Sequence, residues 1–181
     1  MVRCLTLALS AVIIASPAAG QSHVALGPLV TLGDDSHFGL GARAEMDLSD
    51  HLDIDHEFFR DVFGSATATY SFQDCRGGSG CGWLELGGNL NVPVSRRTAD
   101  LVGYVGAGFH VVSAFREESF VDFRSSPSRG TWHRRHTDTS VGLNLIGGLQ
   151  FEVEATPAFV EGKLGLSGAS QFLLSTGVML W

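Results

Sequence analysis

Residues 140–153 alternate between apolar side chains and polar or small ones. The odd positions form an unbroken apolar or glycine series, whereas the even positions carry mostly serine, glycine, asparagine, glutamine and glutamate. Successive side chains of a strand point to opposite faces, so the pattern predicts a strand with one apolar face. The run exceeds the ~5–6 residues of an average strand. It suits a strand tilted across a bilayer, which needs about 9–11 residues.

The same alternation recurs along the chain without any helical period, and it predicts an all-β fold of about eight strands in an antiparallel meander. Two stretches are expected to be long connections: residues 64–81, rich in Gly, Ser and Thr, and the strongly charged residues 116–138. Within the first, residues 66–72 are an optional extension of the preceding strand. The strands are predicted at 23–32, 37–48, 52–58, 83–94, 101–115, 140–153, 157–166 and 171–181.

The second, fourth and sixth connections, at 49–51, 95–100 and 154–156, are predicted to be short turns. The long connections therefore fall at the opposite end of the sheet. Bacterial outer-membrane barrels have this asymmetry, with short periplasmic turns and longer outer loops.

The first 20 residues have the features of a secretory signal peptide. Arg3 gives a positive start, residues 4–15 are apolar, and Pro17 ends the run before the small residues 18–20. The run is too short to cross ~30 Å of hydrocarbon as a helix. We therefore expect residues 1–20 to be cleaved and residues 21–181 to form the barrel domain.

Composition narrows the classes of partner and cofactor. A net charge of -7, with 12 basic and 19 acidic residues, argues against nucleic acid as a partner. Cys4 leaves with the signal, and an even pair then remains in an exported chain, which predicts a surface disulfide between Cys75 and Cys81. Two free thiols are the alternative. No histidine lies near this pair, so neither a metal nor a cofactor is expected.

Charge and glycine content indicate which face of the barrel points inward. The polar faces carry charges of both signs, and an isolated charge facing lipid costs about 2–4 kcal/mol near the midplane. The interior of an eight-stranded barrel is barely wide enough for side chains, so the glycines of the polar faces relieve crowding. The residues expected to form a polar lumen network are Arg43, Glu45, Asp47, Asp53, Asp55, Glu57, Glu85, His110, Glu152, Glu161 and Lys163.

The export signal, the strand meander, the one-sided long connections and the terminal aromatic Trp181 resemble the small bacterial outer-membrane barrels of the OmpA/OmpX type, the "outer membrane protein beta-barrel domain" group. The resemblance is one of pattern over the whole mature chain. It implies a closed up-and-down barrel in the cell outer membrane, inserted by barrel-assembly machinery that reads Trp181. The last strand departs from the pattern because both of its faces are apolar. Its facing therefore stays open between Leu173, Met179 and Trp181 on one side and Phe172, Leu174, Val178 and Leu180 on the other.

The predicted function is that of a monomeric membrane scaffold with functional outer loops and a side-chain-filled lumen. Bulky Phe59, Trp83 and Tyr104 add to the filling. The basic connection is a candidate for contact with outer-membrane lipid and lipopolysaccharide, and a solvated loop is the alternative. Its binding candidates are Arg129, His133, Arg134, Arg135 and His136.

Two other function classes are compatible with an exported barrel. A soluble lipocalin-like protein would place its apolar faces inside and bind a small ligand there. A lipid-modifying enzyme would need a nucleophile, a base and an orienting carboxylate, but no hydrolase motif is present. The raw material for such a site near the outer rim is His110, Ser113, Glu117 or Glu118, His136 and Ser140.

Overall fold

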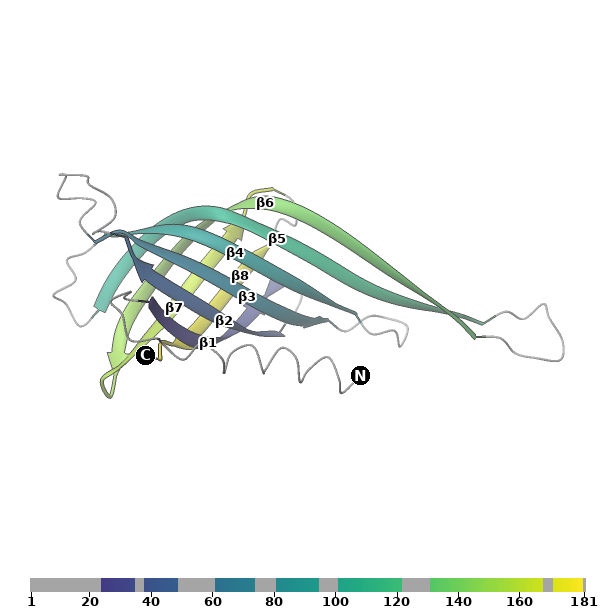
Figure 1. Ribbon diagram of the computed structural model, residues 1–181, viewed down its shortest axis with the longest axis horizontal. Helices are drawn as coiled ribbons and strands as arrows, with labels where there is room; N and C mark the ends of the chain where they lie inside the picture. The colour runs from purple at the N-terminus through teal and green to yellow at the C-terminus, as the bar shows by residue number, and fades with distance from the viewer. Residues whose placement is uncertain are drawn as a thin grey trace.

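The computed structural model is a closed antiparallel barrel (Figure 1). It describes residues 24–34, 38–48, 61–73, 81–94, 101–121, 131–167 and 171–180, and within them eight strands pair in sequence order, with β8 closing onto β1. This confirms the predicted fold class. No helix in these ranges is long and apolar enough to cross a membrane. The strands are β1 Val24–Gly33, β2 Phe38–Asp47, β3 Phe63–Gln73, β4 Cys81–Pro93, β5 Leu101–Val121, β6 Thr131–Val153, β7 Thr156–Gly165 and β8 Phe172–Val178.

The two ends of the barrel differ in character. The start of β1 and the end of the chain lie at the same end, where Leu26 and Leu180 form a main-chain bridge. The β6–β7 connection at that end is the tight turn Glu154–Ala155. At the opposite end the β5–β6 hairpin projects far beyond the other strands (Figure 1).

β3 corrects the prediction that residues 64–81 form a long connection, and it contains residues 66–72, which were expected as an optional strand extension. It runs Phe63–Gln73 and pairs along its length with both β2 and β4. The predicted third strand at 52–58, and with it the predicted turn at 49–51, lies outside the described residues. The sequence pattern is weak because β3 alternates small residues with hydroxyls, which gives little contrast in hydropathy. Its buried polar side chains are Ser65, Thr69 and Ser71, and the positions on its other face include Gly64, Ala66 and Ala68.

The predicted loop at 116–138 is also wrong in large part, because β5 and β6 extend into it from both sides. Their pairing continues from Arg116 opposite His136 to Val121 opposite Thr131. Many charges make the segment read as a loop in hydropathy. Strand pairing is carried by the main chain, so the charged sequence does not prevent it.

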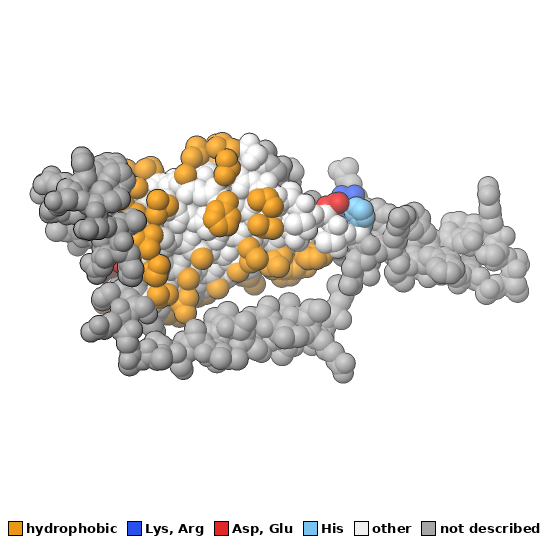
Figure 2. Space-filling model, turned by 45° about the horizontal axis from the view of Figure 1, so that its top comes forward, with side chains coloured by type: hydrophobic (Ala, Val, Ile, Leu, Met, Phe, Trp, Pro, Cys, Tyr) orange, Lys and Arg blue, Asp and Glu red, His pale blue; other side chains and the backbone are white. Residues whose placement is uncertain are grey.

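Large apolar side chains are exposed on the outer surface of every strand, including Val141 at 67% and Phe109 at 59%. Figure 2 shows hydrophobic side chains spread over the barrel wall, with charged and histidine side chains gathered where the hairpin leaves it. Water-soluble monomers rarely expose apolar surface on this scale. The facing is thus the reverse of a soluble ligand-binding barrel.

The facing of β8, left open by its sequence, is defined in the structure. Leu173 and Met179 are buried at 3% and 4% exposure, whereas Phe172 and Leu174 are exposed. Leu173 and Met179 therefore point inward, and Phe172, Leu174 and Leu180 point outward. Trp181 lies outside the described residues.

Candidate functional site

The barrel interior contains a buried ion-pair network centred on Arg43 of β2. Its guanidinium donates from Nε to Glu45 Oε1 and from Nη1 to Glu161 Oε2, each at 2.7 Å. Tyr104 Oη donates to the same Glu161 oxygen at 2.9 Å, and Gln150 Nε2 donates to Glu45 Oε2 at 2.9 Å. Charge-assisted hydrogen bonds of this length are strong when water is excluded. The network joins β2, β5, β6 and β7 across the lumen.

Aromatic rings enclose this guanidinium. The Phe159 ring centroid lies 4.4 Å from Arg43 Cζ, and the Tyr104 centroid lies 5.9 Å away. Phe63 packs edge-on against Tyr104 with centroids 5.3 Å apart. A cation over a ring face is attracted by the ring quadrupole, which compensates part of the lost hydration. All three rings are buried in the barrel interior.

A second ion pair, between Lys163 of β7 and Glu85 of β4, also crosses the lumen. Gln171 Nε2 donates to the other Glu85 oxygen at 3.1 Å. Both charged side chains are buried, so each removes much of the desolvation cost of the other.

The structure brings some predicted lumen residues together and separates others. Arg43, Glu85, His110, Glu161 and Lys163 are buried inside, Glu45 and Asp47 are partly buried, and Glu152 is exposed near the β6–β7 turn. Glu152 therefore lies outside the buried network, because its strand ends beside it. Asp53, Asp55 and Glu57 are outside the described residues.

The His110 side chain is fully buried in the lumen, and neither ring nitrogen has a hydrogen bond of ordinary geometry among the described residues, although the Ser167 carbonyl lies beside the ring. Sequence reasoning also omitted the buried amides Asn89, Asn91 and Asn144 from the lumen set. Their positions could have been predicted, because these asparagines lie on the same polar strand faces as the charged residues that were assigned to the lumen.

The outer hairpin places the predicted binding candidates in register. Glu117 is opposite Arg135 and Glu118 is opposite Arg134, and His133 is opposite Ser119. His136 is exposed and pairs with Asp138 at 3.1 Å. Arg129 lies outside the described residues. The hairpin is therefore balanced in charge at its central positions and is not uniformly basic.

The residues weighed for an enzyme are not assembled into one site. His110 is buried in the lumen, whereas Ser113 is on the exposed face, where its Oγ lies 3.1 Å from Thr139 Oγ1. His136 is opposite Arg116, well along the projecting hairpin. Within the described ranges no three His, Cys, Asp or Glu side chains are grouped to hold a metal ion.

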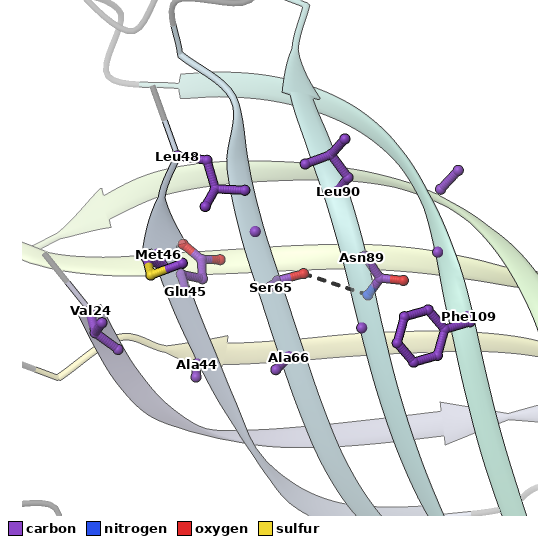
Figure 3. Close-up of a pocket in the computed structure, with 14 residues that line it drawn as sticks. Val24, Ala44, Glu45, Met46, Leu48, Ser65, Ala66, Asn89, Leu90 and Phe109 are labelled. Carbon is purple, nitrogen blue, oxygen red and sulfur yellow. Dashed lines mark hydrogen bonds between the residues drawn. The ribbon is translucent and has the colours of Figure 1, made fainter. Parts of the chain in front are cut away.

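A shallow groove of about 570 Å³ crosses the outer face of β2 to β5 (Figure 3). Small residues line it in register, since Ala44 is opposite Ala66 and Ala66 is opposite Gly88. Met46, Leu90 and Phe109 form its sides. The groove adds apolar surface to the barrel wall, and it is not a polar cavity of the kind that catalysis needs.

No family model and no curated protein sequence matches the chain. Among solved structures, Neisserial surface protein A is 12% identical with a TM-score of 0.51, over 87% of this chain and 93% of that one. The chain has the fold of a small outer-membrane β-barrel. At this identity the likeness is one of fold, and it confirms the resemblance inferred from the strand pattern.

Two further outer-membrane barrels are similar at lower scores. The N-terminal β-barrel domain of Pseudomonas aeruginosa OprF is 16% identical, with a TM-score of 0.43, over 88% of this chain and 100% of that one. Ail, the attachment invasion locus protein of Yersinia pestis, is 10% identical, with a TM-score of 0.45, over 87% and 94%.

Proposed function

We propose that the protein is an integral outer-membrane barrel whose lumen is filled and whose β5–β6 hairpin is an interaction surface outside the cell. The observation that carries this proposal is a long, paired hairpin projecting from a barrel with an apolar outer wall and a charged, closed interior. A scaffold of this kind holds the hairpin at a fixed position above the membrane. Export by a cleaved signal peptide, residues 1–20, is part of the proposal.

The distance that the hairpin extends from the membrane supports the proposal that its partner lies beyond the lipid head groups. On β6 the apolar series ends at Val141, and the exposed Ser113–Thr139 hydroxyl pair follows. From Ser113 to Val121 the strand adds roughly 25 Å at ~3.3 Å per residue. The polar layer on each side of the hydrocarbon is only about 5–8 Å thick. Even when tilted, the end of the hairpin reaches past the head groups.

The edge of β6 supports strand addition as the mode of binding. In the described ranges β7 pairs with β6 only as far as Asn144, with a last bond from Leu166 N to Leu143 O. From Thr131 to Gly142 this edge has no paired strand among the described residues. An open edge accepts an extended peptide, and charged side chains along it restrict which peptides fit.

The experiment follows from the direction of the β6 peptide groups. Leu143 N and O both point toward β7, so the odd positions, including Thr137, direct their main-chain groups to the open edge. Thr137→Pro removes one edge N–H without touching the bonds to β5, and Thr137→Val is its matched control. Extended peptides are first selected from a display library for binding to the unchanged barrel in lipid discs. These peptides should not bind the Thr137→Pro barrel and should still bind the Thr137→Val barrel. Equal binding by both variants would reject strand addition.

Lipopolysaccharide is the second proposed partner, through Arg134 and Arg135. Arg134→Gln with Arg135→Gln should weaken binding of the reconstituted barrel to lipopolysaccharide, and more so at low salt. Unchanged binding would leave these arginines as cross-strand partners of Glu118 and Glu117 only.

The disulfide between Cys75 and Cys81 belongs to this proposal as well. Cys81 begins β4, and Cys75 lies outside the described residues. The bond would close a small loop, so chain entropy limits its contribution to no more than ~2–3 kcal/mol. A thiol reagent should fail to label the folded protein without reductant, and ready labelling of both cysteines would contradict the pairing.

A further inference from the structure

Two buried polar residues in the lumen have unpaired side chains. His110 of β5 is 0% exposed and Asn144 of β6 is 1% exposed. None of their four side-chain nitrogen and oxygen atoms has a hydrogen bond of ordinary geometry among the described residues, although the main-chain carbonyl of Ser167 lies beside the His110 ring. In native protein interiors nearly all buried polar groups form hydrogen bonds to protein or to ordered water. We therefore expect these atoms to have a bound partner.

Glycines surround both residues on the adjacent strands. His110 is opposite Gly87 on β4 and Gly142 on β6. Asn144 is opposite Gly108 on β5 and Gly165 on β7. Every directly paired position therefore lacks a side chain, which lets neighbouring polar groups come close to the strand backbone in a narrow barrel.

The carbonyl oxygen of Asn89 reaches the same place. Asn89 directs its amide nitrogen to Ser65 Oγ at 3.5 Å, while its Oδ1 is buried and unpaired (Figure 3). A Cβ on Gly108 would overlap this oxygen, and a Cβ on Gly142 would lie 2.6 Å from His110 Nε2. The unpaired atoms of Asn89 and His110 thus lie against Gly108 and Gly142, beside the main-chain oxygens of Gly88 and Ser167.

We propose that this glycine-framed cluster, formed by Asn89, His110 and Asn144, binds buried water. A buried water makes about three hydrogen bonds, and the cluster offers both donors and acceptors. Asn144 supplies two N–H donors and a carbonyl acceptor, the His110 ring supplies a nitrogen that is not directed to Ser167, and Asn89 supplies an acceptor. A metal ion fits less well, because the amide N–H groups repel a cation and one imidazole is the single strong ligand of the cluster.

Two substitutions, made singly and together, test the proposal through the sign of their Tm changes and through whether those changes add. Asn144→Leu and His110→Phe are made singly and together in the full chain, and the Tm of the barrel in detergent is read from heat-modifiable gel mobility. A hydrated cluster predicts that each single change lowers Tm, because the remaining residue and its water lose bonds. The double variant should then lose clearly less than the sum of the two, since the site no longer exists.

Other outcomes overturn the proposal. A dry cluster predicts that each single change raises Tm, because an unpaired polar group is removed. Overpacking by the larger side chains predicts that the double variant loses the full sum or more. His110→Gln, which keeps a donor and an acceptor, is the matched control and should lose less than His110→Phe.

A direct measurement on the unchanged protein keeps the test independent of variant folding. Rotating-frame NMR should show cross-relaxation from water to the α protons of Gly108 and Gly142. The signals should vanish in the double variant. Their absence from the unchanged protein would overturn the proposal.

Discussion

Arg43 and Glu161 lie 118 residues apart in sequence and meet across the lumen at 2.7 Å. Each is almost fully buried, and each depends on the other for charge compensation. Breaking a buried pair by removing one member usually costs about 3–5 kcal/mol, because the charge that remains is uncompensated.

Arg43→Met should therefore destabilise the folded barrel by about 3–5 kcal/mol. Adding Glu161→Gln should recover a substantial part of this loss, because the neutral amide no longer requires a cation. Urea unfolding in lipid vesicles measures both. Arg116→Met, at an exposed position of the hairpin, is the control and should change stability by less than ~0.5 kcal/mol. A similar loss for Arg43→Met and Arg116→Met would contradict the assignment.

The adjacent glycines Gly147 and Gly148 should respond oppositely to alanine. A Cβ on Gly148 would overlap the Tyr104 ring, whereas a Cβ on Gly147 meets nothing closer than Tyr104 O at 4.0 Å. Gly148→Ala should cost about 1–3 kcal/mol by displacing Tyr104 from Glu161. Gly147→Ala should stabilise the strand by about 0.5–1 kcal/mol. Equal effects in urea unfolding would show that the two positions do not face opposite sides.

Glycine in the β6–β7 turn should stabilise the folded barrel. Glu154 and Ala155 have φ of 51° and 65°, the left-handed geometry of a two-residue hairpin turn. A non-glycine residue there costs about 1–2 kcal/mol, part of which glycine recovers. Ala155→Gly should raise the free energy of unfolding by about 0.5–1 kcal/mol. Ala42→Gly, within β2, should lower it by a similar amount, and two changes of the same sign would refute the turn argument.

Purified protein in planar bilayers should show no large, stable conductance. The Arg43 network and the Lys163–Glu85 pair cross the lumen, and rings fill the space beside the first. Arg43→Ala with Tyr104→Ala removes much of this filling and should produce measurable, fluctuating conductance. Large, steady channels from the unchanged protein would favour a porin.

The parts of the fold that could be predicted are those with strong hydropathy contrast. Residues 140–153 of β6 are read directly from their alternation, and the facing of Arg43, Glu85, Glu161 and Lys163 follows from the cost of a charge in lipid. β3 was predicted only as an optional extension at 66–72 because it has little contrast, and the outer hairpin was missed because its sequence is strongly charged. Both are held by main-chain pairing to neighbours, which a local pattern does not contain.

The candidate site was predictable as a set of residues but not as a set of partners. Which carboxylate meets Arg43 depends on barrel closure and stagger, and Glu161 comes from a strand far along the chain. The amides Asn89 and Asn144 carry no charge, so the energy argument that selected the ionic residues does not select them. Their role depends on the glycines opposite them, which only the register reveals.

The bond between β2 and β7 also constrains how the barrel assembles. In an open sheet these strands are separated by β3 to β6 on one side and are joined through β1 and β8 only after the seam closes. Until then Glu161 lacks its cation and Arg43 has only Glu45 of its own strand, on a sheet entering a bilayer where an uncompensated charge is costly. Half-closed intermediates are therefore penalised, and closure and charge pairing should occur in one cooperative step. During insertion, the lumen network would thus favour the barrel whose strands have paired in the correct order and closed.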